Sequence, residues 1–301
     1  MRVALQFLAM GLVWGASFLF MKVGLGGLSF AQVAWARSIL GALALGVIAV
    51  ALRVRLPRRP VVYLHFLVLG LTFAALPYLL FSWAEQYVTS GLASIYNATT
   101  PITTAIMAAL VFRVERLTAS QLLGILLGVL GVVLIIAPWQ VALGGALAGQ
   151  LACIGATLCY GFSGAYAKRF ILPHGIGGVP YALLMIGWAG VIMALLTPVI
   201  AAPVRIDGWI AASMLALGVL GTGVAYVWNG NVLAAWGPTA TSTVTYITPV
   251  VGVLLGVLVL HETLSWHQPA GALVVLAGIL LAQGRLRLPR RGSRLARQVA
   301  R

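Results

Sequence analysis

Acidic residues are almost missing from this sequence of 301 residues. It contains four Asp plus Glu against nineteen Lys plus Arg, and charged residues make up only 8% of the chain. A soluble protein of this length needs many more charged side chains to cover its surface. Because 62% of the residues are hydrophobic and the mean hydropathy is +1.06, we expect an integral membrane protein.

Other features that the sequence lacks exclude several classes of function. Cys153 and Cys159 are six residues apart in one apolar run, so they face different sides of a helix and predict neither a disulfide nor a metal pair. We find no Gly-rich nucleotide loop, no nucleic-acid-binding motif, and no cluster of His, Asp, Glu or Cys with catalytic spacing. The sequence therefore predicts no enzyme, no metal and no cofactor.

Long apolar runs are what the sequence has in abundance. Runs of about 17 to 25 residues are the length that a helix needs to cross a bilayer, and they are continuous rather than alternating, which excludes barrel strands. They lie at residues 4–24, 31–52, 61–82, 89–112, 120–137, 146–167, 179–201, 208–230, 239–260 and 268–284. The sequence thus predicts an all-α polytopic membrane protein with ten transmembrane helices.

Positive charges lie mainly on one side of these ten helices. If the amino terminus is cytoplasmic, sixteen of the nineteen Lys and Arg fall on the cytoplasmic side, including seven arginines in residues 285–301, whereas Lys22 and Arg205 fall outside. Cytoplasmic loops of membrane proteins carry this excess of positive charge. We therefore expect both termini in the cytoplasm of a bacterial cell, with the protein in the inner membrane.

The sequence also repeats itself. With an offset of 147 residues, Glu115 falls on Glu262 and Gln121 on Gln268, and with an offset near 148 Pro101 falls on Pro249. Each copy holds five helices, and an odd number forces the second copy to cross the membrane in the opposite direction. The predicted divisions are a first repeat at 1–142, a second, inverted repeat at 143–284 and a basic tail at 285–301.

The two copies share features that resemble a known family. Each begins with an aromatic residue, Gly, any residue and Ser, at Trp14 to Ser17 and Tyr160 to Ser163, and each ends in Glu, any residue, Leu and Thr or Ser. In this respect the sequence resembles the drug/metabolite transporter superfamily, in its ten-helix EamA-type branch. The resemblance implies export of small metabolites across the inner membrane, with helices 1 to 4 and 6 to 9 around a central cavity and helices 5 and 10 at the periphery. The sequence also looks similar to aromatic amino-acid exporters of the YddG type.

Polar and aromatic residues deep within the apolar runs are the candidate substrate-binding residues. A polar group without a partner in hydrocarbon costs several kcal/mol, so each must face a cavity or another helix. Interhelical hydrogen bonds and aromatic packing remain the alternative for each of them. The candidates are Trp14, Ser17, Tyr78, Ser82, Tyr96, Asn97, Thr100, Tyr160, Ser163, Trp228, Asn229, Thr245 and Tyr246.

Two basic residues and two prolines within or near the spans have open interpretations. The long side chains of Lys22 and Arg37 can reach the headgroups, which we favour, but an inward-facing Arg37 would bind a substrate anion. Pro101 and Pro249 lie at matching depths, so they predict either paired hinges or static kinks.

The acidic residues are assigned to structure rather than transport. Glu115 and Glu262 each precede a capping box, at Thr118 to Gln121 and at Ser265 to Gln268, and we expect them to organise the start of the next helix. Glu85 follows the third apolar run and is expected to be exposed. Because no acidic residue is then left within the hydrocarbon, the sequence predicts a facilitated or exchange carrier.

These expectations combine into one functional prediction. An inverted repeat offers two nearly equivalent packings with a binding site at the repeat interface. We expect an alternating-access transporter that exports small metabolites, with aromatic or other apolar amino acids as substrates. A multidrug or other metabolite exporter, and a membrane scaffold without transport activity, remain the alternatives. The expected partners are the small-molecule substrate and the lipid bilayer, and a monomer is plausible although an oligomer is not excluded.

Overall fold

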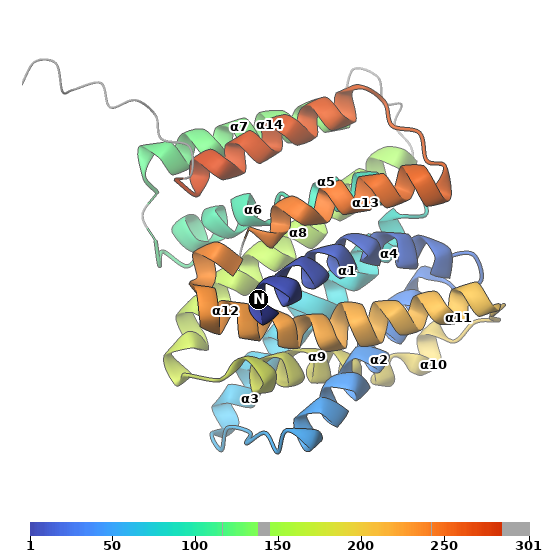
Figure 1. Cartoon of the computed structure of the whole chain (residues 1–301), viewed down its shortest axis with the longest axis vertical. Coiled ribbons are helices and arrows are strands. Elements are labelled where there is room, and N and C mark those ends of the chain that lie inside the picture. Colours follow the sequence, from blue (N-terminus) through green and yellow to red (C-terminus); the bar gives the residue numbers. More distant parts are fainter. Residues whose placement is uncertain (116, 138–144, 242, 285–301) are drawn as a thin grey trace, which may run out of the picture.

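The computed structural model describes residues 1–115, 117–137, 145–241 and 243–284, and every regular element in these ranges is helical (Figure 1). Arg116, the boundary predicted between residues 142 and 143, and the basic tail at 285–301 lie outside the described residues. The predicted all-α fold class is confirmed.

Within the described ranges, ten helical spans follow one another, as predicted, and several of them consist of more than one element. The first five are α1 (Arg2–Gly24), α2 (Phe30–Ala51), α3 (Pro60–Leu69) with η1 (Gly70–Ala75) and α4 (Leu76–Ala84), α5 (Ser90–Asn97) with α6 (Thr100–Ile106) and η2 (Met107–Val111), and α7 (Ala119–Ile136). The second five are α8 (Gly145–Phe170), α9 (Gly178–Leu195), α11 (Gly208–Leu215) with η4 (Ala216–Val224) and α12 (Ala225–Thr241), α13 (Val244–Leu260) and α14 (His267–Ala282). The short η3 (Leu172–His174) and α10 (Thr197–Ile200) lie in connections.

The lengths of these spans fit a membrane. Among the described residues, seven helices are long and apolar enough to cross a bilayer, and α13 and α14 are shorter apolar helices. The fourth span is the most interrupted, because α5 ends before Pro101 and a new helix begins there. The eighth span runs to Gly237, well beyond the predicted residue 230, and breaks where the φ of this glycine is +78°.

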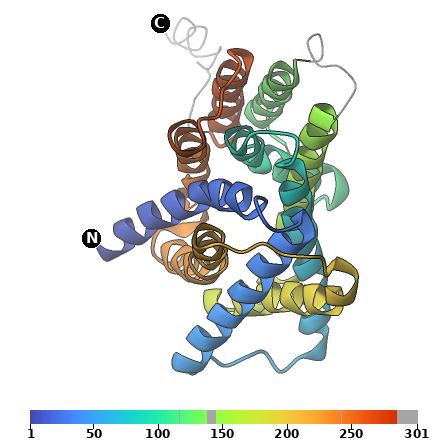
Figure 2. The same cartoon turned by 90° about the vertical axis from the view of Figure 1, so that its right-hand side faces the viewer.

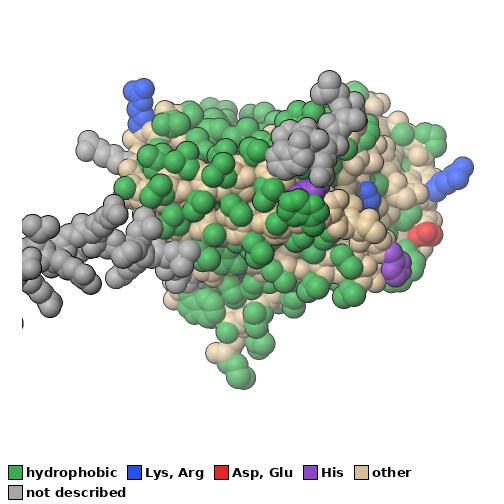
Figure 3. All heavy atoms as spheres, turned by 90° about the horizontal axis from the view of Figure 1, so that it is seen from above, with side chains coloured by type: hydrophobic (Ala, Val, Ile, Leu, Met, Phe, Trp, Pro, Cys, Tyr) green, Lys and Arg blue, Asp and Glu red, His purple; other side chains and the backbone are tan. Residues whose placement is uncertain are grey.

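The surface of the molecule is apolar where it would meet lipid. Figure 3 shows one face largely covered with hydrophobic side chains, with the charged side chains lying mainly toward its two ends. We call the end of the bundle at which α1 begins the amino end, and the end at which α1 stops the far end. Figures 1 and 2 both show α7 and α14 side by side at one edge of the bundle.

Glycines on α7 and α14 show that the two halves are related by a two-fold rotation. Gly124 lies against Gly278, since a Cβ built on Gly124 would be 2.5 Å from the Gly278 carbonyl oxygen, and Gly131 lies against Gly271 in the same way, at 2.8 Å. With the repeat offset of 147, Gly124 corresponds to Gly271 and Gly131 to Gly278. Exchange of the two halves therefore turns each contact into the other, as an isologous interface requires.

The inner helices show the same relation. Gly15 of α1 packs against Val251 of α13, and Gly161 of α8 packs against Thr103 of α6. The offset of 148 that aligns the two prolines also aligns Thr103 with Val251, so equivalent glycines meet equivalent partners. The π-helical segments η1 and η4 occupy equivalent places in the third helix of each half. The structure is thus an inverted repeat of two five-helix units.

Helix starts follow the predicted capping chemistry in part. Thr118 and Gln121 form the expected capping box at the start of α7. The capping box expected from Ser265 is absent, because α14 begins later and has Trp266 as its N-cap residue without a side-chain hydrogen bond. Ser29 and Gln32 form a further capping box at the start of α2.

The close contact between α7 and α14 yields a stability prediction. The substitution Gly124→Ala places a methyl group against the α14 backbone and should destabilise the protein by about 1–3 kcal/mol through overpacking. Gly46→Ala is the matched control, because a Cβ at this helical glycine meets nothing within 4 Å, and it should be neutral or slightly stabilising. Thermal unfolding in detergent measures both variants. Equal unfolding temperatures for the two would contradict this packing.

Candidate transport cavity

A central cavity of about 350 Å³ lies between helices of both halves. This volume falls within the range of small-molecule sites in proteins. The cavity is lined by Trp14, Ser17, Phe18, Arg37, Phe73, Phe81, Asn97, Thr100, Tyr160, Tyr226, Asn229, Leu233, Thr241, Val244, Thr245 and Thr248. The lining combines an aromatic wall, neutral polar groups and one guanidinium.

Six aromatic side chains form a continuous wall around the cavity. The ring of Trp14 meets the edge of Tyr226 at a centroid distance of 5.7 Å, and Phe73 lies 6.2 Å from Tyr226 and 5.1 Å from Tyr160. Phe81 continues the chain from Tyr160, at 6.1 Å, to Phe18, at 5.5 Å. Tilted and edge-to-face contacts at these distances are favourable, so the wall is a preformed surface for an apolar or planar solute.

Arg37 is the only ionised side chain among the described lining residues. It is 8% exposed, its Nε donates to Thr222 Oγ1 at 3.2 Å, and its Nη1 contacts Met21 Sδ at 3.7 Å. The guanidinium carbon lies 3.9 Å from the centre of the Tyr78 ring, in cation–π geometry. A guanidinium has five N–H donors, and these contacts use two of them, so the remaining donors are available to a ligand.

The π-helical turn of η4 helps to position Arg37. Within η4 the hydroxyl of Thr222 donates to the carbonyl of Leu217, five residues earlier, at 3.2 Å. This hydroxyl therefore keeps its lone pairs for the Arg37 guanidinium. Gly41 allows the close approach, because a Cβ there would lie 2.6 Å from Cγ2 of Thr222. Small residues on α2 and a widened turn in η4 thus bring a cation into an apolar region.

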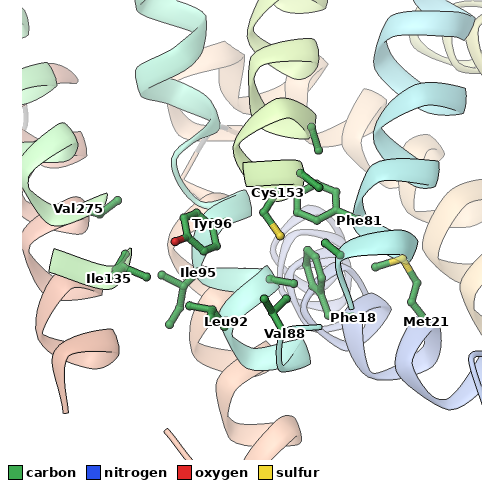
Figure 4. Packing of buried hydrophobic residues seen from close by; sticks show 14 of the residues in the cluster. Phe18, Met21, Phe81, Val88, Leu92, Ile95, Tyr96, Ile135, Cys153 and Val275 are labelled. Atoms are coloured by element: carbon green, nitrogen blue, oxygen red, sulfur yellow. The ribbon is translucent and has the colours of Figure 1, made fainter. Parts of the chain in front are cut away.

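The cavity leads toward the amino end and is sealed at the far end. Its lining reaches Val244 at the start of α13, and Leu233 is 42% exposed. Toward the far end Phe81 is 2% exposed, and Met21 beyond it is fully buried. Figure 4 shows Phe18, Phe81 and Met21 packed together with Val88, which follows α4.

The structure brings part of the predicted site together at this cavity. Eight of the predicted residues line it: Trp14, Ser17, Arg37, Asn97, Thr100, Tyr160, Asn229 and Thr245. The other predicted binding residues lie outside the lining: Tyr78 beneath Arg37, Ser82 against Met21 Sδ, Tyr96 bonded to Gln150, Ser163 bonded to Thr72, Trp228 packed near Met10, and Tyr246 bonded to Gln283. Of these six, Tyr78 supports the site indirectly, through Arg37.

Eight of the lining residues were not predicted from the sequence. They are Phe18, Phe73, Phe81, Tyr226, Leu233, Thr241, Val244 and Thr248. Thr248 could have been found, because the offset of 148 that aligns Pro101 with Pro249 places it on Thr100. The apolar members carry no such signal, since an apolar side chain that faces a cavity cannot be told by sequence from one that faces lipid.

The favoured interpretations of Arg37 and of Glu85 are wrong. Arg37 points into the bundle rather than to the headgroups, and Lys22 donates from Nζ to the backbone carbonyls of Glu85 and Val88 at the end of α4. Glu85 is fully buried rather than exposed, because α8 and α2 pack against the helix that it terminates and Lys22 of α1 bonds its backbone carbonyl. Packing of neighbouring helices, which composition does not reveal, overrides both expectations.

The repeated glutamates have structural partners, but not the expected ones. The carboxylate of Glu262 accepts from the backbone N–H groups of Ser90, at 2.7 Å, and Gly91, at 3.0 Å, and from the Ser90 hydroxyl. Glu262 therefore caps α5 rather than α14, the helix that follows Glu262 in the sequence. At the start of α5 the positive end of the helix dipole favours an anion. Glu115 forms an ion pair with Lys168.

The two prolines occupy different settings. Pro101 lies in the first turn of α6, directly after the break that ends α5, whereas Pro249 lies inside the continuous helix α13. Both remain candidates for hinges.

An inverted repeat of apolar helices around a central cavity is an architecture typical of membrane transporters. Residues 1–137 and residues 147–283 each match the EamA-like transporter family. The chain belongs to this family, as the resemblance of its two halves predicts.

Relatives of known name match over nearly the whole chain. An uncharacterized transporter of Bacillus subtilis, YdfC, is 27% identical over 89% of this chain and 86% of its own length. A probable amino-acid metabolite efflux pump of Salmonella typhimurium is 27% identical over 89% and 90%. A probable terminal-alkyne amino-acid exporter of Streptantibioticus cattleyicolor is 26% identical over 90% of both chains. One solved crystal structure, 18% identical, has the same fold, with a TM-score of 0.65 over 94% of this chain and 98% of that chain.

The bond between Arg37 and Thr222 can be tested by its effect on stability. Thr222→Val removes the acceptor of Arg37 Nε at nearly constant volume and should destabilise the protein by about 2 kcal/mol, the scale of a hydrogen bond to a charged group. Thr222→Ser keeps the hydroxyl and should lie much closer to wild type. Thermal unfolding in detergent compares the two. If both lose the same stability, packing rather than the hydrogen bond fixes this contact.

Proposed function

We propose that this transporter exports small metabolites that carry a carboxylate on an apolar or aromatic body, and that amino acids of this kind are its substrates. The names of two relatives, an amino-acid metabolite efflux pump and an amino-acid exporter, support this substrate class. The observation that carries the proposal is the position of Arg37 in the cavity.

Arg37 would bind the carboxylate of the substrate. A buried guanidinium without an anion is costly, and Arg and carboxylate make paired, charge-assisted hydrogen bonds. Thr222 and Tyr78 already hold the side chain in place, so little conformational freedom is lost when a ligand arrives. The carboxylate would displace no protein anion, because no Asp or Glu is present among the described lining residues.

The rest of the lining would select the body of the substrate. The aromatic wall from Trp14 to Phe18 offers flat apolar surface, and Asn97, Thr100 and Asn229 offer neutral hydrogen-bonding groups for an amino group. A cavity with one positive charge repels cationic solutes. This charge balance favours amino acids over the cationic drugs of the multidrug alternative.

Transport would proceed by alternating access between two packings of the inverted repeat. The excess of positive charge supports a cytoplasmic amino end, and in that orientation the state described above, with the cavity leading to the amino end, would be the inward-facing one. The second state would exchange the roles of the two halves, and the helices that contain Pro101 and Pro249 would bend between them.

A transport assay tests the carboxylate proposal. Purified protein in liposomes is screened for counterflow of labelled amino acids, and the best substrate is then competed with 3-phenylpropionate, which has the carboxylate alone, and with L-phenylalaninamide, which lacks it. We expect competition by the acid and not by the amide. Arg37→Gln should weaken binding roughly 30-fold, about 2 kcal/mol.

Lys168→Gln is the matched control for this assay. It removes a cation that lies outside the cavity, paired with Glu115, and should leave counterflow unchanged. Equal competition by acid and amide, or counterflow by Arg37→Gln with wild-type affinity, would refute carboxylate recognition by Arg37. If no member of the panel shows counterflow with the wild-type protein, amino acids are not its substrates.

The proposed orientation has its own test. Fusions of a fluorescent protein that matures only in the cytoplasm, and of a phosphatase active only in the periplasm, are made after Gly284 and in the loop that contains Arg205. We expect fluorescence and no phosphatase activity at the first site, and the reverse at the second, because the positive loops stay inside. The opposite pattern would place the cavity of this structure toward the periplasm.

A further inference from the structure

Glu85 is the feature of the bundle that its proposed transport chemistry leaves unexplained. It is the C-cap residue of α4 at the far end, its side chain is 0% exposed, and both carboxyl oxygens lie buried without a hydrogen-bond partner. An unpaired buried carboxylate is among the costliest groups that a protein can hold. In a chain with four acidic residues, such a group is unlike the other three.

The charged and titratable groups around Glu85 come from four neighbouring segments. Lys22 on α1 and Arg37 on α2 favour its charged form, whereas Glu262 after α13 disfavours it, and Glu85 in turn influences the Cys153 thiol on α8 electrostatically. Burial is the largest influence, and it raises the pKa of the Glu85 carboxyl well above its usual range.

Each of the nearby charged groups already has another partner. Lys22 donates to the backbone carbonyls of Glu85 and Val88, Arg37 donates to Thr222, and Glu262 accepts from Ser90 and Gly91. No cation is therefore committed to the Glu85 carboxylate, and its like-charged neighbour is held in place by the start of α5.

The same residues close the far end of the bundle. A hydrogen bond from Lys22 connects α1 to the turn between α4 and α5, and hydrogen bonds to Glu262 connect the segment after α13 to the start of α5. We call these hydrogen bonds the far-end ties. Glu85 lies among these ties, so its carboxyl is out of water when they form. When the far end opens in alternating access, the ties must break and water must reach the carboxyl.

We propose that Glu85 is a proton-binding site whose occupation accompanies closure of the far end. In the open state the carboxyl faces water and is ionised, and on closing it takes one proton from the solution at that end and is buried as the neutral acid. On opening it returns the proton to the same side. This inference rests on the proposed function only in that far-end closure is one step of the transport cycle.

The direction of the pH effect follows from linkage. The closed state holds the proton more tightly than the open state, so closure is favoured as the pH falls and opening as the pH rises. Between the two pKa values of Glu85, one in the open and one in the closed state, each pH unit shifts the equilibrium by up to tenfold.

Two measurements on the full chain in lipid nanodiscs test the site. Infrared spectroscopy at neutral pH should show the carbonyl band of a protonated carboxylic acid in wild-type protein, and Glu85→Gln should remove it. Glu115→Gln, which alters the ion-paired carboxylate, is the control and should retain the band. Spin labels at Gly26→Cys and Gln86→Cys, with Cys153 and Cys159 replaced by Ala, then report the distance between the α1–α2 and α4–α5 turns.

The expected result is a distance distribution that shifts toward the closed, short population as the pH falls, and that stays closed at every pH in Glu85→Gln, which mimics the neutral acid. A wild-type protein without the acid band, or with a pH-independent distance, would overturn the proposal. If Glu85→Gln does not fold, the double variant Glu115→Gln/Asp207→Asn is measured instead, which leaves Glu85 and Glu262 as the only acidic side chains. Persistence of the acid band in this variant supports the proposal, and loss of the band overturns it. Counterflow is measured in parallel, so that failure of the proton site and absence of transport are separate results.

Discussion

The burial of one guanidinium among aromatic side chains is the constraint on which the site depends. Arg37 is almost completely removed from solvent, and the groups that hold it are a hydroxyl, a thioether and a tyrosine ring, none of them an anion. A buried cation in this state is only partly compensated, and under the proposed function a substrate carboxylate would supply the missing anion. The fold thus leaves Arg37 without an anionic partner among the groups that hold it.

The inverted repeat offers two nearly equivalent packings of the helices around such a site. The glycine contacts between α7 and α14 are reciprocal, and those of α1 with α13 are equivalent to those of α8 with α6. The same helix contacts therefore occur in both halves, which run through the membrane in opposite directions. Within the part of the chain that the structure describes, the polar contacts at the far end are not repeated at the amino end, where Glu115 pairs with Lys168. In this state the described polar contacts at the two ends therefore differ, although the helices that carry them are equivalent.

Much of the fold was predictable from the sequence, because crossing a bilayer imposes a length and a composition on each helix, and because a repeated pattern such as Glu115 and Glu262 survives in both halves. The site was predictable only in part. Polar residues such as Asn97 and Asn229 in mid-span point to a cavity, since hydrocarbon would penalise them. The direction of Arg37 and the burial of Glu85 depend on which neighbouring helices cover them, and no local pattern encodes that arrangement. The aromatic residues of the cavity wall were predictable only in part for the same reason, because the sequence around Phe73 is equally consistent with a side chain that faces lipid.

The central claim is that Arg37 holds the carboxylate of the substrate within the cavity. The most direct measurement is a structure of the protein bound to 4-iodo-L-phenylalanine, in which the heavy iodine atom marks one end of the ligand unambiguously. The account predicts the carboxylate within hydrogen-bonding distance of the Arg37 guanidinium and the iodine against the aromatic wall. A ligand bound with its carboxylate away from Arg37, or outside this cavity, would contradict it.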